Sequence, residues 1–190
     1  KVAFSTLGCR VNQYESEAMA EKFIREGYEV VDFSEIADVY VINTCTVTHM
    51  SDRKSRQYIR RMKKKNPNAI IAVVGCYSQI APKEVSAIDG VDVVLGTRNK
   101  GDVVYYVNKS RDEQAAQIYV ESVLRNKKFE ALNIEEYQDK TRAFLKIQDG
   151  CNRFCAYCII PYSRGSVCSK EPRQVLDEIN KLSEHGFKEI

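Results

Sequence analysis

Residues 70–76 read Ile-Ile-Ala-Val-Val-Gly-Cys, a short apolar run that ends in a glycine and a cysteine. Such a run is typical of a buried strand, and the glycine lets the chain turn tightly where the strand ends. Similar apolar runs alternate with helical patterns along the first hundred residues, which is typical of a parallel sheet covered by helices. Five strands are expected, at residues 2–6, 29–33, 39–43, 70–74 and 91–95.

Helical patterns fill the gaps between these strands. The first helix has Asn12 as its expected cap and Gly27 as its stop, and the second is ended by Pro67. The four helices are expected at residues 13–26, 52–65, 82–88 and 100–109. The sequence therefore predicts an α/β fold with a doubly wound, flavodoxin-like parallel sheet of five strands.

The pattern changes after residue 110, where a polar stretch rich in Gln and Glu begins. We expect a connection there, with one helix or an edge strand. A second unit follows, with a strand at 143–147, a cysteine loop, an irregular segment, a helix at 172–185 stopped by Gly186, and the start of another strand. One such βα unit cannot bury its own faces, so we expect the sequence to be incomplete. The expected divisions are residues 1–110, 111–140 and 141–190.

Composition places the chain among ordinary globular proteins, with 44% hydrophobic and 29% charged residues among 190. No apolar run approaches the roughly 18 residues of a membrane span, and the N-terminus lacks a signal-peptide profile. We therefore expect a cytoplasmic protein with no membrane partner. Seven cysteines are an odd number for a secreted disulfide framework, and a chain of this size needs no such framework.

A net charge of +3 is too small to indicate nucleic-acid binding by itself. The charge is concentrated, however, because eight basic residues and no acid lie between Arg53 and Lys65. On a helix they would leave Tyr58, Ile59 and Met62 as the buried side. Two interpretations remain open: a solvated helix face, or a surface that helps to bind a phosphate backbone.

Cys151, Cys155 and Cys158 form a Cys-x-x-x-Cys-x-x-Cys run directly after the strand expected at 143–147. Three thiolates this close together indicate a metal site. A [4Fe–4S] cluster normally takes four protein thiolates. Three in one loop therefore predict either a distant fourth ligand or an iron left open for a substrate or cofactor.

Cys9, Cys45 and Cys76 each follow a predicted strand, namely the first, third and fourth. In the strand order 2-1-3-4-5 these strands are neighbours about 4.8 Å apart, so the three thiols would converge within about 10 Å. That is close enough to hold one cluster. The alternative is that they are small buried cysteines, a common environment for this residue.

Zinc is the other metal considered. It prefers four ligands, commonly from paired Cys-x-x-Cys motifs, whereas each group here offers three cysteines. Neither His49 nor His185 has an obvious spacing to complete a set, although His49 lies only four residues after Cys45.

Four stretches carry a family resemblance: 6–17 (TLGCRVNQYESE), 43–48 (NTCTVT), 74–76 (VGC) and 149–161 (DGCNRFCAYCIIP). Together they resemble the radical S-adenosylmethionine (SAM) methylthiotransferases, over nearly the whole chain. The first stretch is most similar to the branch that modifies N6-threonylcarbamoyladenosine beside the anticodon of tRNA. Other branches act on isopentenyladenosine in tRNA or on an aspartate of a ribosomal protein.

The resemblance implies two [4Fe–4S] clusters with separate roles. Cys151, Cys155 and Cys158 would hold the cluster whose open iron binds SAM, and reduction would cleave SAM to a 5′-deoxyadenosyl radical. The other three cysteines, Cys9, Cys45 and Cys76, would hold an auxiliary cluster that carries the sulfur. Hydrogen abstraction at C2 of the adenine would then let a methylthio group add. The implied partners are tRNA, an electron donor and a sulfur donor.

The same resemblance implies roles for single residues near the second trio. Tyr157 would lie beside the cluster and the adenine, with a packing aromatic as the alternative. Arg164, followed by Gly165, would help to seat substrate or cofactor. Where relatives commonly read Arg-Ser-Arg, residues 168–170 read Cys-Ser-Lys, which removes a positive charge, and Cys168 is expected to be a bystander. Residues 141–190 would begin a radical-SAM partial barrel whose remainder is absent, so this piece alone is expected to be inactive.

Two other classes of protein compete with an enzyme. An electron-transfer protein with two clusters would normally close each iron with four cysteines, and this chain offers three per group. A zinc-stabilised RNA-binding module would be built around the basic helix, and its metal content would distinguish it.

Overall fold

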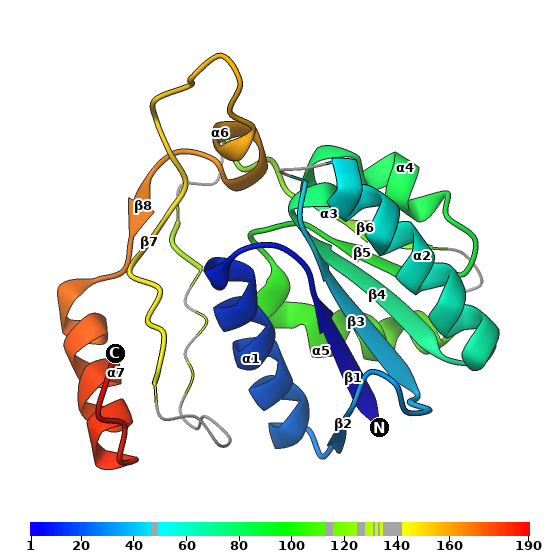
Figure 1. The fold of residues 1–190 in the computed structure, drawn as a ribbon, viewed down its shortest axis with the longest axis horizontal. Helices are drawn as coiled ribbons and strands as arrows, with labels where there is room; N and C mark the ends of the chain where they lie inside the picture. Colours follow the sequence, from blue (N-terminus) through cyan, green and yellow to red (C-terminus); the bar gives the residue numbers. More distant parts are fainter. Residues whose placement is uncertain (47–48, 113–115, 125–127, 131, 133, 135–141) are drawn as a thin grey trace.

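The computed structural model describes residues 1–46, 49–112, 116–124, 128–130, 132, 134 and 142–190. Its centre is a parallel sheet of six strands in the order β2-β1-β3-β4-β5-β6 (Figure 1). The strands are β1 (Val2–Thr6), β2 (Val30–Val31), β3 (Val39–Thr44), β4 (Ile70–Gly75), β5 (Val93–Leu95) and β6 (Gln117–Tyr119). The predicted flavodoxin-like order is confirmed, and β6 adds an edge strand in the segment where either a helix or an edge strand was expected.

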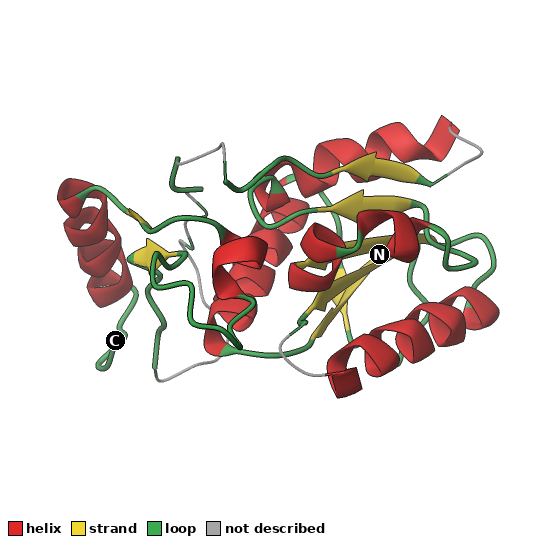
Figure 2. Ribbon diagram, turned by 90° about the horizontal axis from the view of Figure 1, so that it is seen from above, coloured by secondary structure: helices red, strands yellow, loops and turns green. Residues whose placement is uncertain are grey.

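Helices cover both faces of the sheet and make three layers (Figure 2). The helices of this unit are α1 (Arg10–Arg25), α2 (His49–Lys65), α3 (Cys76–Ile80), α4 (Pro82–Ser86) and α5 (Val103–Lys109), with 3₁₀ turns at Lys100–Asp102 and Ser110–Asp112. Residues of α2, α3 and α4 pack on one face, and residues of α1 and α5 pack on the other.

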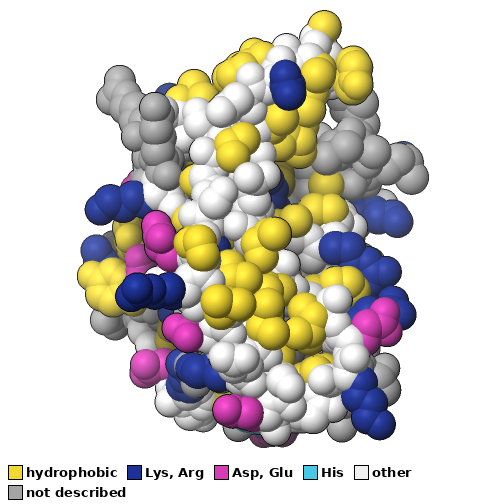
Figure 3. Space-filling model, turned by 90° about the vertical axis from the view of Figure 1, so that its left-hand side faces the viewer, with side chains coloured by type: hydrophobic (Ala, Val, Ile, Leu, Met, Phe, Trp, Pro, Cys, Tyr) yellow, Lys and Arg dark blue, Asp and Glu magenta, His cyan; other side chains and the backbone are white. Residues whose placement is uncertain are grey.

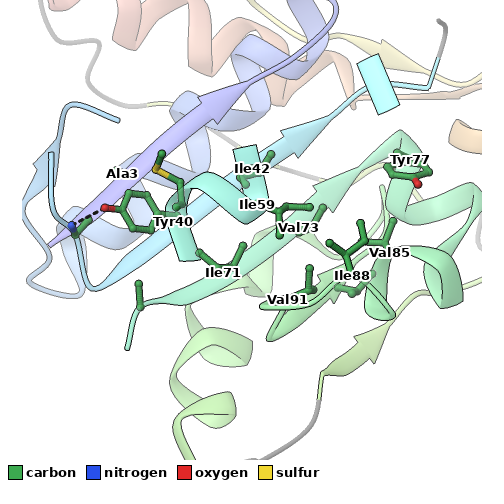
Figure 4. Packing of buried hydrophobic residues seen from close by; sticks show 14 residues of the cluster. Ala3, Tyr40, Ile42, Ile59, Ile71, Val73, Tyr77, Val85, Ile88 and Val91 are labelled. Carbon is green, nitrogen blue, oxygen red and sulfur yellow. Dashed lines mark hydrogen bonds between the residues drawn. The ribbon is translucent and has the colours of Figure 1, made fainter. Parts of the chain in front are cut away.

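The central strands β3 and β4 are buried along their whole length because both of their faces are covered. Side chains alternate between the two faces along each strand. Ile42, Ile71 and Val73 therefore pack with Ile59 of α2 on one side, as Figure 4 shows. Their neighbours in the strands point to α1 and α5. This double core fixes the strand ends, where the cysteine loops begin.

Some helix boundaries differ from the prediction. The helix expected at 13–26 begins at Arg10, so Asn12 is not its cap; its side chain instead donates hydrogen bonds to backbone carbonyls of two loops. Helix α3 was missed because its five residues, Cys76–Ile80, are too few to show a helical period. The helix expected at 100–109 is divided between a 3₁₀ turn and α5.

The second unit contains α6 (Ile160–Arg164), α7 (Pro172–Glu184), and the antiparallel pair β7 (Gln148–Asp149) and β8 (Cys168–Ser169). The predicted helix at 172–185 is confirmed to within one residue. The strand predicted at 143–147 is wrong for the described residues. Residues 143–147 form no strand; the parallel bridge beside them joins Arg142 to Glu189, and Ala143 N donates to Glu189 O at 2.9 Å. A ladder needs a neighbour along its whole length, and the described chain provides one only at this point.

Hydrophobic side chains gather on the face of the molecule beside α7 (Figure 3). Ile147 is 55% exposed and Leu176 is 60% exposed. They line a groove of ≈ 560 Å³ together with Gln148, Ser169, Lys170, Pro172 and Val175. In the described part of the chain, no helix is both long enough and apolar enough to span a membrane.

Candidate metal centres

The first three cysteines lie at the carboxyl ends of three adjacent strands. Cys9 follows β1, Cys45 follows β3 and Cys76 follows β4. Thr44 pairs with Gly75, so Cys45 and Cys76 leave the sheet side by side. The Cys9 loop is equally near, because a Cβ added to Gly8 would lie 2.8 Å from Sγ of Cys45. The structure therefore brings together the three loops that the sequence predicted to converge.

Two asparagines hold these loops in place. The amide of Asn12 donates to Leu7 O at 2.7 Å and to Thr44 O at 3.0 Å. The amide of Asn43 donates to Asn12 O at 2.9 Å. The loop before Cys9 and the end of β3 before Cys45 are thus joined through the buried side chain of Asn12.

The three thiols differ in environment. Cys9 is exposed, whereas Cys45 and Cys76 are buried. Burial raises the pKa of the Cys76 thiol, and the positive charges of Arg164 and Lys100 oppose that rise. Metal binding requires the thiolate, and these two cations favour that form.

The second trio lies in the loop between β7 and α6. Cys151 N donates to Gly165 O at 3.0 Å, and Cys158 N donates to Cys155 O at 2.9 Å. Cys155 is exposed and its two partners are half-buried. Tyr157, expected beside a cluster, has a side chain that is 93% exposed, so it packs against little of the described chain.

The donor set fits iron–sulfur clusters in its chemistry. All seven cysteines are free thiols, and six of them form the two trios. Among the described residues, no three His, Cys, Asp or Glu side chains are placed to hold a single metal ion. A cube of four irons is larger than one ion, so its thiolates need not meet so closely. Both cluster assignments remain predictions.

Arg164, expected to seat substrate or cofactor, is buried among charged side chains of both units. Its Nη1 donates to Glu15 Oε1 at 2.9 Å and to both oxygens of Asp149 at 3.2 Å. Lys146 Nζ contacts the same two carboxylates, at 2.7 Å and 2.6 Å. Lys100 pairs with Glu15 as well. We call these five residues the Glu15 network: Glu15, Lys100, Lys146, Asp149 and Arg164.

The Glu15 network shifts the pKa values of its members. Burial by itself would raise the pKa of Glu15, but Arg164, Lys100 and Lys146 hold it well below its ordinary value. The pKa of Asp149 is lowered despite burial, by Arg164 and Lys146. Both carboxylates are therefore ionised at neutral pH, and the network contains two anions and three cations.

Sequence reasoning missed Glu15, Lys100 and Lys146 as members of a site. Glu15 is buried in α1 together with Asn12 and Ser16, and its burial depends on distant partners, so it has no local signal in the sequence. Lys146 offered a weak sequence signal of burial, because it interrupts the apolar run Ala-Phe-Leu-Lys-Ile at 143–147. A lysine within a buried run needs a partner, and here it has two carboxylates.

Comparison with known proteins identifies the family to which the chain belongs. Residues 1–96 match the model described as "Uncharacterized protein family UPF0004". The chain belongs to UPF0004. The matched region holds strands β1 to β5 and the first cysteine trio.

Relatives of this UPF0004 chain carry methylthiotransferase names. It is 48% identical over 189 residues to "Threonylcarbamoyladenosine tRNA methylthiotransferase MtaB" of Bacillus subtilis and 43% identical over 190 residues to the protein of that name in Aquifex aeolicus. It is 34% identical over 194 residues to "tRNA-2-methylthio-N(6)-dimethylallyladenosine synthase" of Clostridium perfringens. These matches cover 100%, 100% and 98% of the chain. The chain spans 42%, 46% and 42% of the relatives' own lengths. The family resemblance drawn from the sequence is confirmed.

The seventh cysteine of the UPF0004 chain has its own surroundings. Cys168 is buried, and Arg98 Nη1 donates to its Sγ at 2.9 Å. Arg98 also donates to Arg164 O at 2.6 Å. Its predicted role as a bystander to the metal centres remains a prediction.

Proposed function

We propose that the protein containing this chain is a radical-SAM methylthiotransferase that places a methylthio group at C2 of N6-threonylcarbamoyladenosine beside the tRNA anticodon. The observation that carries the proposal is the convergence of Cys9, Cys45 and Cys76 at one sheet edge, in a chain that holds a second trio of free cysteines. The names of the relatives agree with it.

The two trios would bind the two clusters. Cys151, Cys155 and Cys158 would hold one, and Cys9, Cys45 and Cys76 the other. When bound, the clusters and SAM would supply the radical and the sulfur. An aromatic C–H bond has no useful acidity, so acid–base side chains near pH 7 cannot open it, and a cofactor must do so.

The choice of substrate branch rests on the degree of identity. The chain is 48% identical to the threonylcarbamoyladenosine enzyme of B. subtilis and 34% identical to the dimethylallyladenosine synthase of C. perfringens. Residues 6–17 support the same branch. Action on isopentenyladenosine in tRNA, or on an aspartate of a ribosomal protein, is the alternative within the family.

The basic residues of α2 support tRNA as the partner. Arg56 and Lys63 are held by ion pairs with Glu84 and Asp92. Lys65 donates a hydrogen bond to the carbonyl of Ser34. The other five basic side chains are exposed and have no ion-pair partner among the described residues; these form the α2 stripe: Arg53, Lys54, Arg60, Arg61 and Lys64. At 100° per residue they cover about one third of the helix circumference, and they extend for about 16 Å along it.

The α2 stripe begins near the first cysteine trio. Arg56, one turn further along α2, donates to the hydroxyl of Tyr77 at 2.8 Å, and Tyr77 adjoins Cys76. A row of unpaired cations that leads away from the reaction site is suited to a phosphate backbone whose base occupies that site. An electron donor, a sulfur donor and a cytoplasmic location complete the proposal.

Nucleoside analysis of tRNA from a deletion strain tests the function. We expect methylthio-threonylcarbamoyladenosine to disappear and its precursor without the methylthio group to accumulate. The intact gene should restore it, and the Cys45→Ser gene should not. Unchanged modification in the deletion strain would contradict the proposal, and loss of the isopentenyladenosine product instead would move the protein to the other branch.

Metal analysis separates the enzyme from the two other classes. The anaerobically purified full-length protein should contain about eight irons with matching sulfide, four for each cubane cluster. One or two zinc ions without sulfide would favour an RNA-binding module. If added SAM leaves the signal of the reduced clusters unchanged, an electron-transfer protein is favoured.

A further inference from the structure

The Glu15 network lies between the sheet unit and the second unit. Glu15 and Lys100 belong to the sheet unit, and Lys146, Asp149 and Arg164 belong to the second unit. No member is more than 6% exposed. The ion pairs that Glu15 makes with Lys146 and Arg164 are therefore buried contacts between segments far apart in the chain.

On one side, the network reaches the first cysteine trio. Arg164 Nη2 donates to Asn12 Oδ1 at 2.6 Å. The amide of Asn12 in turn holds the carbonyls of Leu7 and Thr44. Thr44 directly precedes Cys45, and Leu7 lies two residues before Cys9.

On the other side, the network reaches the second trio. Asp149, which binds Arg164, lies two residues before Cys151. The carbonyl of Gly165, next to Arg164, accepts a hydrogen bond from Cys151 N. Arg164 therefore contacts the supports of both cysteine loops.

The second loop is carried by a short antiparallel pair of strands. The strands β7 and β8 have two residues each, and a ladder this short is weak by itself. The guanidinium of Arg164, by contrast, is planar and binds three side chains in fixed directions.

We propose that the Glu15 network sets the separation and orientation of the two cysteine trios, with Glu15 and Arg164 as positioning residues. The inference rests on the proposed function, in which both centres must face one adenine carbon. A displacement of about 1 Å between reacting groups can lower a rate by about a hundredfold. A network of paired charges satisfied in one geometry resists such a displacement more than an apolar contact does, because apolar contacts have no direction.

The test uses the full-length protein with two charge-preserving variants, Glu15→Asp and Arg164→Lys. Glu15→Asp shortens the carboxylate arm, and Arg164→Lys removes the planar fork that also binds Asn12. Glu21→Asp is the matched control, because Glu21 lies on the same helix and pairs with Arg25 away from the junction. Iron and sulfide content is measured first, and then the spin–spin coupling between the reduced clusters by electron paramagnetic resonance.

Both junction variants should keep about eight irons and show an altered spin–spin coupling, whereas Glu21→Asp should match the parent protein. The methylthio product formed per 5′-deoxyadenosine released should fall by about 10-fold to 100-fold in the junction variants. The radical would still form in them, but away from its target.

Parental coupling and a parental product ratio in both variants would overturn the inference and leave the proposed function intact. Loss of iron from one trio alone would also overturn it, because the network would then support a single loop. If one variant fails to fold, the other decides. A parent protein without clusters would instead contradict the proposed function.

Discussion

Glu15 has no exposure to solvent, and three cationic side chains bind it. A buried ion cluster of this kind contributes little net stability compared with apolar packing, because removing the charges from water is costly. Removing a single member is a different matter, since it leaves its partners buried and unpaired. The residues of this network are therefore better explained by what they connect than by the stability they provide.

Glu130 is a further, half-buried carboxylate at this junction, and its charge depends on pH. Burial raises its pKa to about 7, although Gly101 N donates to it at 2.7 Å and Lys100 lies near. Its other oxygen, Oε2, is buried and accepts no hydrogen bond from the residues that the structure describes. The folded protein thus favours the protonated form of Glu130.

Replacing Glu130 by Gln should remove a pH-dependent loss of stability. A carboxyl whose pKa rises on folding contributes stability that is fully present below about pH 4.5 and is lost as the pH rises through about 7. Between pH 5 and pH 8 the parent should lose about 2.5 kcal/mol more than Glu130→Gln. Urea unfolding at both pH values measures this, with the exposed Glu26→Gln as the control. Parallel losses in parent and Glu130→Gln would contradict the assignment.

Replacing a single cysteine should change the iron content of the protein in a way that identifies the ligands. Cys45→Ser in the full-length protein should lower the iron content from about eight to about four, because one cluster loses a ligand. Cys168→Ser is the matched control, since Cys168 is also a buried free thiol but belongs to neither trio. Equal iron in Cys45→Ser and Cys168→Ser would show that Cys45 is not a ligand.

Single functional residues could be predicted from the sequence where the residue type itself indicates the chemistry, as cysteine does for metal binding. The positions of Cys9, Cys45 and Cys76 follow from strand ends that the apolar runs reveal, whereas the second trio was placed after a strand at 143–147 that does not form. The partners of Arg164 could not be predicted, because Glu15 and Asn12 lie far away in the chain and only the packing of the two units brings them close. Polar contacts between residues far apart in the chain produce no periodic pattern in the sequence.

At the scale of elements, the turn from β4 into α3 determines where Cys76 points. Gly75 has φ +103° and ψ −157°, a combination open essentially to glycine alone. A Cβ there would lie 2.5 Å from Thr44 O, which is backbone and cannot move aside.

Gly75→Ala should therefore lower the free energy of unfolding by at least about 3 kcal/mol, from backbone strain and a steric clash together. Gly27→Ala is the control, because Gly27 also has a positive φ but has open space where the Cβ would be. Gly27→Ala should lower the free energy of unfolding by about 1–2 kcal/mol. Urea denaturation compares the two, and equal losses would mean that the clash is relieved elsewhere.

The α2 stripe gives a prediction about binding. Replacing Arg53, Arg60 and Lys64 by Gln should weaken binding of tRNA at low salt. It should also reduce the slope of log K against log salt concentration by about 2–3, or about 0.7–0.9 for each phosphate that is no longer neutralised. Lys109→Gln, on α5 at the opposite face, is the control and should leave the slope unchanged. If the triple variant keeps the parental slope of log K against log salt concentration, the α2 stripe is a solvated surface and does not bind phosphates.

Strands were predictable from continuous apolar runs where both faces of the run are buried, as in β3 and β4. The run at 143–147 is also mostly apolar but forms no strand, and the parallel bridge beside it is made by Arg142. A strand forms only beside another strand that accepts and donates its backbone hydrogen bonds, and the sequence of the run itself does not show whether that partner is present.

At the scale of the whole molecule, α1 serves both units. Met19 and Phe23 pack on the sheet, while Glu15 binds the second unit and Tyr14 donates to Glu178 of α7 at 2.9 Å. One helix is thus the common wall of two units that are separate along the chain (Figure 1).

Because of this shared helix, we expect the chain to unfold in a single calorimetric transition. Glu15→Gln should lower the stability by about 3–5 kcal/mol, since it leaves buried cations unpaired, and it should separate the transition into two. The ratio of calorimetric to van't Hoff enthalpy should rise above one in that variant. Glu21→Gln should stay within about 1 kcal/mol of the parent. A single, unshifted transition in Glu15→Gln would show that the units are not coupled through this residue.

The two trios differ in how their cysteines are spread along the chain, and this has a consequence for maturation. Cys151, Cys155 and Cys158 lie within one loop, so they can meet in a chain that is still partly folded. Cys9, Cys45 and Cys76 meet only after three strands have paired, and such distant contacts form late. We therefore expect iron to reach the second trio first during refolding and reconstitution, visible as two kinetic phases of which Gly75→Ala delays only the later.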